Sequence, residues 1–116
     1  MKLKTSELIG PALDWAVAKC VYGSKYGKLQ VYKGILSGTE MLSQSWAPST
    51  DWAQGGPIIE REQITTRFWL NEPFITAYLN QEDALWAEGD TPLIAAMRCY
   101  VASKLGDEIE LPEELL

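Results

Sequence analysis

Apolar residues recur at helical spacing near the start of the chain, which predicts an amphipathic helix over residues 11–22. Proline is tolerated in the first turn of a helix, so we expect this helix to begin near Pro11 and to stop at Gly23. Asp14 and Lys19 lie off the apolar stripe. The stripe consists of Leu13, Ala16, Val17, Cys20 and Val21.

A second helical pattern near the end of the chain carries a start and a stop signal. Asp90 or Thr91 provides a cap, Pro92 suits the first helical position, and Gly106 ends the pattern. Arg98 lies off the apolar row. We expect the buried row to be Ile94, Met97, Val101 and Leu105.

Between these helices, β-branched and aromatic residues predict three strands, in residues 65–71, 73–79 and 84–88. The short links "NEP" and "NQED" favour antiparallel neighbours. Because both faces look apolar, we expect helices on more than one side of the sheet. We expect one face to carry Phe68, Leu70, Phe74, Thr76 and Tyr78, and the other Trp69, Ile75, Ala77 and Leu79. A noisier short strand is predicted in residues 28–36, followed by a loop partly pinned by Trp46.

The stretch "STDWAQGGPIIERE" predicts a further helix, over residues 51–62. Ser49, Thr50 and Asp51 are three consecutive candidates for its cap. The run Gly55-Gly56-Pro57 falls inside it, so we expect a kink or a break there; a short form would begin at Pro57.

These elements define an α+β fold, a single small domain with the order α-β-α-β-β-β-α. We expect a mainly antiparallel sheet of three to four strands flanked by helices. The domain is expected to cover residues 1–106, and residues 107–116 to form an acidic C-terminal tail that extends away. Its apolar residues Ile109, Leu111, Leu115 and Leu116 are the ones expected to touch the body or a partner. The 116 residues are 47% hydrophobic and 22% charged, which is typical of a globular domain that folds alone.

The net charge of −6 is unevenly distributed. Residues 1–36 carry +4, residues 37–90 carry −7, residues 91–106 carry +2 and the tail carries −5. The basic residues suited to a phosphate backbone are confined to Lys2, Lys4, Lys19, Lys25, Lys28 and Lys33, with little aromatic interleaving. Nucleic acid is therefore not a favoured partner. No apolar run reaches the ~18 to 20 residues of a membrane span, so we expect no membrane association.

Several catalytic chemistries are excluded by what the sequence lacks. It has no histidine, no GxSxG motif, and no Walker spacing in the basic turn "GSKYGK" at residues 23–28. Cys20 and Cys99 are expected to be reduced core thiols, with one disulfide as the alternative. Paired carboxylates occur at Glu60, Glu62, Glu82, Asp83, Glu88 and Asp90, and we interpret them as solvated. We therefore expect no catalytic residue, no cofactor and no metal.

Two interpretations of residues 49–62 stay open. In the structural one, Ser49 to Asp51 cap a helix, Trp52 is a core residue, and Gly55 and Gly56 permit close packing. In the functional one, free amides, hydroxyls and Arg61 attract an anion, and the glycines admit a ligand or a partner backbone. Asp51 repels a bare phosphate, so a protein partner fits better.

Among the five tryptophans, Trp46 and Trp86 are expected to be exposed and to mark an interface. The candidate binding residues are Ser49, Thr50, Asp51, Trp52, Gln54, Gly55, Gly56, Arg61, Trp86 and Arg98.

The stretch at residues 49–62, together with "GDTPLIAAMRCYVASKLGDEIELPEEL" and "LKTSEL…ALDWAVAK", resembles the NinX-type family of small tailed-phage proteins. It is more distantly similar to phage ABA sandwich domains, which implies helices flanking a sheet. The resemblance favours a continuous, kinked second helix. It implies a phage or prophage accessory protein of unassigned molecular function and supplies no catalytic residue.

Three functional classes follow. The first is a non-enzymatic binding protein that modulates a bacterial host protein in the host cytoplasm, in host takeover or anti-defence. The second is a binder of a small anionic ligand such as a nucleotide, for which residues 49–61 with Arg98 would form the pocket. The third and weakest is a nucleic-acid binder. A homo-oligomer stays open in each case.

Overall fold

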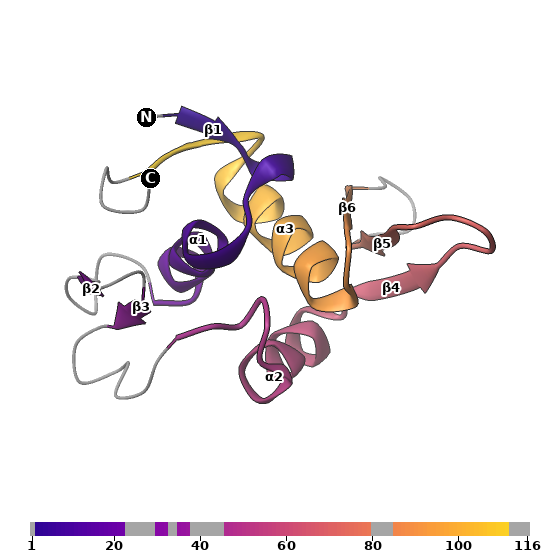
Figure 1. Cartoon of the computed structure of the whole chain (residues 1–116), viewed down its shortest axis with the longest axis horizontal. Coiled ribbons are helices and arrows are strands. Elements are labelled where there is room, and N and C mark those ends of the chain that lie inside the picture. Colours follow the sequence, from indigo (N-terminus) through magenta and orange to yellow (C-terminus); the bar gives the residue numbers. More distant parts are fainter. Residues whose placement is uncertain (1, 23–29, 33–34, 38–45, 80–84, 112–116) are drawn as a thin grey trace.

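The helix α3 (Pro92–Leu105) lies at the centre of the molecule, between the helix α1 (Gly10–Tyr22) and a three-stranded sheet (Figure 1). The computed structural model describes residues 2–22, 30–32, 35–37, 46–79 and 85–111. As predicted, Thr91 caps α3 by accepting a hydrogen bond from the Ile94 N–H at 3.1 Å, and Pro92 opens the helix. Its buried residues occur on nearly all sides, as expected for a helix enclosed by other elements: Leu93, Ile94, Ala95, Ala96, Met97, Cys99, Tyr100 and Val101.

The sheet consists of β4 (Thr65–Phe68), β5 (Ile75–Tyr78) and β6 (Trp86–Gly89), in that spatial order and antiparallel throughout. The predicted α+β class and the three antiparallel strands are confirmed. The predicted division of the faces is wrong, because Phe68 pairs with Ile75 and so lies on the same side as Ile75 and Ala77. The alternation cannot be carried through the intervening turn, where Asn71 has a φ of +67°.

Only one side of this sheet is packed against α3. On that side Ala87 and Gly89 are buried, and a Cβ on Gly89 would lie 2.6 Å from the Ala95 nitrogen, so only glycine permits this close approach. The other helices, α1 and α2 (Trp52–Glu62), pack against α3 itself. The expectation that helices cover more than one side of the sheet is therefore wrong for the described residues. The side away from α3 carries Thr65, Arg67, Thr76, Tyr78, Trp86 and Glu88.

α2 is continuous from Trp52 to Glu62, which is the form that the family resemblance favours. The alternative of a break, with a short form beginning at Pro57, is wrong. Asp51 is its N-cap and accepts a hydrogen bond from the Ala53 N–H at 2.9 Å. Pro57 removes one hydrogen bond, the one to the carbonyl of Ala53. Both residues are exposed, so water can satisfy that carbonyl and the helix continues.

The two ends of the described chain pair with each other, which the sequence did not predict. β1 (Lys2–Lys4) and β7 (Glu108–Glu110) form an antiparallel ladder, and Ile109 and Leu111 are buried. Residues 107–111 therefore belong to the folded body, and the expectation that the chain extends away from Asp107 is wrong for them. The expected contact of Ile109 and Leu111 with the body is confirmed. The short 3-10 helix η1 (Thr5–Glu7) links β1 to α1, which begins close to Pro11 as predicted.

The noisy strand predicted in residues 28–36 corresponds to two antiparallel strands, β2 (Gln30–Tyr32) and β3 (Ile35–Ser37). Several other predictions concern positions outside the described residues: Gly23, Lys25, Lys28, Lys33, Glu82, Asp83 and residues 112–116.

Candidate functional site

Hydrogen bonds to Asp14 hold the segment before α2 against α1. The Asp14 carboxylate accepts a hydrogen bond from the Ser49 N–H at 2.8 Å, and the Asp14 carbonyl accepts one from Trp46 Nε1 at 2.8 Å. Although Asp14 lies off the apolar stripe, it is only 5% exposed. Burial raises the pKa of its carboxyl, and the Ser49 hydrogen bond opposes that rise. Ser49 is therefore a buried structural residue.

The glycine and glutamine of the predicted site also have structural roles. A Cβ on Gly55 would collide with the Pro48 carbonyl oxygen and lie 2.6 Å from Leu93 Cδ2. Gln54 Oε1 accepts a hydrogen bond from the Ala47 N–H at 2.6 Å. These contacts favour the structural interpretation at Gly55, where glycine is needed for close packing. At Gly56 it is not needed, because a Cβ there would meet nothing closer than 3.9 Å.

The exposed surface of α2 has several of its polar groups already paired, which makes it less suited to an anion. Trp52 is 58% exposed, so the structural interpretation, which made it a core residue, is wrong at this position. Thr50 is exposed, and Asp51 already occupies the free amide of Ala53. The Arg61 side chain pairs with Glu62 at 3.0 Å, and this hydrogen bond raises the pKa of Arg61. Its charge is therefore partly neutralised.

Arg98 lies elsewhere and connects two elements to α3. Its Nε donates to the Leu8 carbonyl at 2.7 Å, and its Nη1 donates to the Glu88 carbonyl at 2.8 Å. Burial lowers the pKa of Arg98, with Asp90 opposing that shift. Two guanidinium donors of Arg98 therefore hold Leu8, the residue after η1, and β6 against the central helix.

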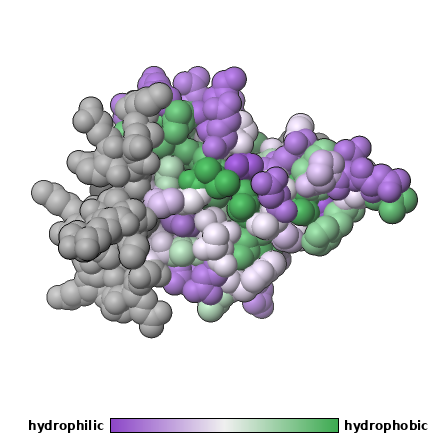
Figure 2. All heavy atoms as spheres, viewed as in Figure 1, coloured by the Kyte–Doolittle hydropathy of each residue, from purple (hydrophilic) through white to green (hydrophobic). Residues whose placement is uncertain are grey.

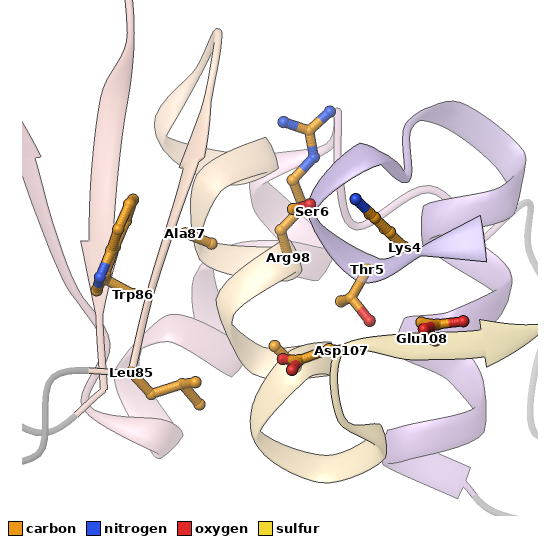
Figure 3. Close-up of a pocket in the computed structure, with 10 residues that line it drawn as sticks. Lys4, Thr5, Ser6, Leu85, Trp86, Ala87, Arg98, Asp107 and Glu108 are labelled. Carbon is orange, nitrogen blue, oxygen red and sulfur yellow. The ribbon is translucent and has the colours of Figure 1, made fainter.

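Arg98 also lines a cavity of about 410 Å³ between β6, η1 and β7, shown in Figure 3. In that view the side chains of Lys4 and Arg98 lie apart from the carboxylates of Asp107 and Glu108. No residue from Ser49 to Arg61 lines this cavity, so Arg98 does not share it with them. The lining residues are Lys4, Thr5, Ser6, Leu85, Trp86, Ala87, Arg98, Ala102, Asp107 and Glu108.

A second cavity, of about 440 Å³, lies on the side of the β4–β6 sheet away from α3. We call this surface the aromatic face; it is lined by Trp69, Glu72, Phe74, Thr76, Tyr78, Trp86 and Glu88. Trp69 Nε1 donates to Thr76 Oγ1 at 2.8 Å, which fixes the indole beside the centre of the sheet. The Arg67 guanidinium lies 4.0 Å from the centroid of the Trp69 ring, within the range of a cation–π contact.

Trp86 is 54% exposed, as predicted, and lines both cavities. Trp46, its predicted partner, is half-buried and bonded to Asp14, so its predicted exposure is wrong. The residues that do accompany Trp86 are Trp69, Phe74 and Tyr78, and Tyr78 lies directly opposite Trp86 in the ladder. The alternation of Phe74, Thr76 and Tyr78 was the available signal for this surface.

The hairpin that joins β4 to β5 projects from the body and exposes further apolar side chains. Phe68 is 71% exposed and Leu70 is 89% exposed. Figure 2 shows hydrophobic residues on this projecting hairpin, among hydrophilic ones. Exposed aromatic and aliphatic side chains next to one another are typical of a protein-binding surface.

The cysteines are free thiols, as predicted. Burial raises the pKa of Cys20 to about 12 and that of Cys99 to about 11, so neither forms a nucleophilic thiolate readily. Among the described residues, no group of three or more cysteine or carboxylate side chains is placed to hold a metal ion.

Fold and surface together define a small α+β protein with a helix-backed, three-stranded antiparallel sheet, whose aromatic face no described helix covers. Residues 4–104 match the family described as Bacteriophage P22, NinX, and the chain belongs to this family of phage proteins. The resemblance seen in the sequence is confirmed, and the protein is a phage accessory protein. A comparison with curated proteins finds no match. No helix in the described part of the chain has the length and apolar character needed to cross a membrane.

Proposed function

We propose that the protein is a non-enzymatic binding protein that modulates a bacterial host protein in the host cytoplasm, and that it binds through the aromatic face. The observation that carries this proposal is the exposure of Trp86 beside Trp69, Phe74 and Tyr78 on the side of the sheet away from α3. Tryptophan and tyrosine are enriched among the residues that contribute most to protein–protein affinity.

The geometry of the aromatic face suits binding without large rearrangement. Trp69 is held by its hydrogen bond to Thr76 and by Arg67, and Thr76 is only 5% exposed. A side chain fixed before binding loses little rotamer freedom on association. Burial of one exposed aromatic side chain contributes about 1.5–3 kcal/mol, so a few such residues supply much of a moderate affinity.

The chemistry of the chain supports binding more than catalysis. It contains no histidine, and the pKa values of both thiols are raised by burial. Nucleic acid is a less suitable partner, because Lys2 and Lys4 lie opposite Glu110 and Glu108 in the β1–β7 ladder. Acidic residues beside the lysines weaken attraction to phosphates.

The proposal is tested by affinity capture from host-cell extract with three forms of the protein: wild type, Trp86→Ala and Trp52→Ala. Trp52 is the matched control, because it is also exposed, at 58%, but lies on α2. We expect wild type and Trp52→Ala to retain one host protein in stoichiometric amount, and Trp86→Ala to lose it. Equal retention by all three forms, or retention of no host protein, would contradict the proposal.

A small anionic ligand is the second candidate, favoured by the cavity lined by Lys4, Arg98, Thr5 and Ser6. Thr5 Oγ1 already donates to the Gly106 carbonyl at 2.6 Å, and Asp107 and Glu108 lie in the same cavity, which makes it less suited to an anion. Thermal unfolding in the presence of nucleotides tests this candidate, since a ligand that binds the folded state raises the Tm. A rise abolished by Lys4→Ala would support it, and no rise would exclude the nucleotides tested.

A further inference from the structure

We infer that the aromatic face receives a cationic side chain, an arginine or a lysine, from a basic segment of the partner protein. The inference rests on the proposed function and names the chemistry of its partner. In this arrangement the cation lies against the rings of the aromatic face and pairs with the carboxylate of Glu88.

Strand pairing between β5 and β6 places the residues of the aromatic face around Thr76. Glu88 lies directly opposite Thr76, and Trp86 lies directly opposite Tyr78. Phe74 and Tyr78 are two residues before and after Thr76, so all three share one side of the sheet. Trp69 completes the set through its hydrogen bond to Thr76 Oγ1. A cavity of about 440 Å³ is thus bordered by aromatic rings and a carboxylate.

The charges that line the cavity select a cation. Among the described residues, Glu72 and Glu88 are the charged ones that line it, and both are acidic. An apolar or anionic occupant would remove these carboxylates from water without giving them a partner, which is unfavourable. A guanidinium or ammonium group pairs with a carboxylate and is also attracted to the faces of aromatic rings.

One cation–π contact already exists beside this cavity. Arg67 lies opposite Thr76, on the side of the aromatic face, and its guanidinium is 4.0 Å from the Trp69 ring centroid. Because Arg67 is held against Trp69, the edge of the cavity formed by β6, where Trp86 and Glu88 lie, is where a second cation fits. A metal ion is a poorer occupant, since no group of three or more metal-binding side chains occurs among the described residues.

The test uses the tryptophan indole N–H signals of the full-length protein in two-dimensional NMR spectra. Two short peptides are titrated, acetyl-Gly-Arg-Gly-amide and the same peptide with citrulline, which keeps the shape of arginine but not its charge. We expect the arginine peptide to shift the Trp86 and Trp69 signals and leave Trp52 unchanged, with the citrulline peptide about 2- to 30-fold weaker. Equal effects of the two peptides, or arginine-peptide shifts that spare Trp86, would overturn the inference.

The variant Glu88→Gln tests the contribution of the carboxylate to peptide affinity separately from that of the aromatic rings. Glu88 is exposed and its side chain does not face α3, so we expect the variant to fold normally and to bind the arginine peptide about fivefold more weakly. Glu60→Gln, also exposed but on α2, is the matched control and is expected to bind as wild type does. Unchanged affinity in Glu88→Gln would contradict the pairing. If host-protein capture still depends on Trp86 but not on Glu88, the inference fails while the proposed function stands.

Discussion

Asp14 and Ser49 connect two elements that the sequence separates by 35 positions, through a buried hydrogen bond of 2.8 Å from the Ser49 N–H to the Asp14 carboxylate. This contact anchors the segment that leads into α2 against α1. It explains why a carboxylate off the apolar stripe is nevertheless buried, and it makes the stability of the fold depend on the protonation of one side chain.

The first prediction concerns pH. Because burial raises the pKa of Asp14, the folded state binds this proton more tightly than the unfolded state does. Its contribution to stability is present below the usual aspartate pKa and is lost as the pH rises through the raised value. Urea unfolding of wild type and Asp14→Asn, from about pH 3 to about pH 7, should show wild type losing stability relative to the variant. A constant difference between the two proteins would contradict this.

The same site gives a check at fixed pH. Asp14→Ala leaves the Ser49 N–H without its acceptor, and we expect a loss of about 1–3 kcal/mol in the free energy of unfolding. Asp14→Asn keeps an acceptor oxygen and should be clearly more stable than Asp14→Ala. Equal stability of the two variants would mean that the hydrogen bond contributes little.

The second prediction uses the two adjacent glycines of α2. Gly55→Ala should lower the free energy of unfolding by about 1–3 kcal/mol, because its Cβ would press on the Pro48 carbonyl and Leu93. Gly56→Ala should raise it by about 0.5–1 kcal/mol, since alanine favours helix and the space is open. Urea unfolding measures both. Effects of the same sign would contradict the described packing of α2.

The third prediction concerns Arg98. Arg98→Ala removes the donors to the Leu8 and Glu88 carbonyls, and we expect a loss of about 1.5–3 kcal/mol in stability. Arg98→Lys should recover only part of it, because one ammonium cannot reproduce the fork geometry of the guanidinium. The exposed Arg61→Ala is the control and should change stability by less than about 0.5 kcal/mol. A neutral Arg98→Ala would show that the bridge is not stabilising.

The fourth prediction concerns the thiols. With pKa values of about 12 for Cys20 and about 11 for Cys99, both are overwhelmingly protonated near neutral pH. A disulfide reagent such as DTNB at about pH 8 should therefore label neither of them rapidly in the folded protein and both in urea, because the thiolate is the reactive form. Fast labelling of Cys99 without denaturant would contradict its burial.

Elements with a strong local signal were predictable from the sequence. Thr91 and Pro92 mark the start of α3 and Gly106 marks its end. These limits could be predicted because capping depends on neighbours within a few residues. β1 and β7 were missed because each has three residues and its partner lies at the other end of the chain. Helix propensity left the continuity of α2 open between a kink and a break, since it does not reveal that Ala53 and Pro57 are exposed; only the family resemblance favoured the continuous form.

The candidate site was predicted only in part. The exposure of Trp86 followed from its place in a short edge-like strand, and the structure confirms it. The exposure predicted for Trp46 is wrong, as is the core position that the structural interpretation gave Trp52. Both depend on contacts that the sequence does not show: the packing of α2 on Pro48 and Leu93, and the hydrogen bond from Trp46 to Asp14. The aromatic face was missed because the expectation of helices on both sides of the sheet left it no open surface.

The most direct test of the aromatic face as the binding surface is the NMR spectrum of protein labelled with ¹⁵N-tryptophan, recorded while unlabelled host-cell extract is added. The indole signals of Trp69 and Trp86 should broaden or shift, and that of Trp52 should not. Selective change at Trp52, with Trp69 and Trp86 unaffected, would place the binding surface on α2 and contradict this account.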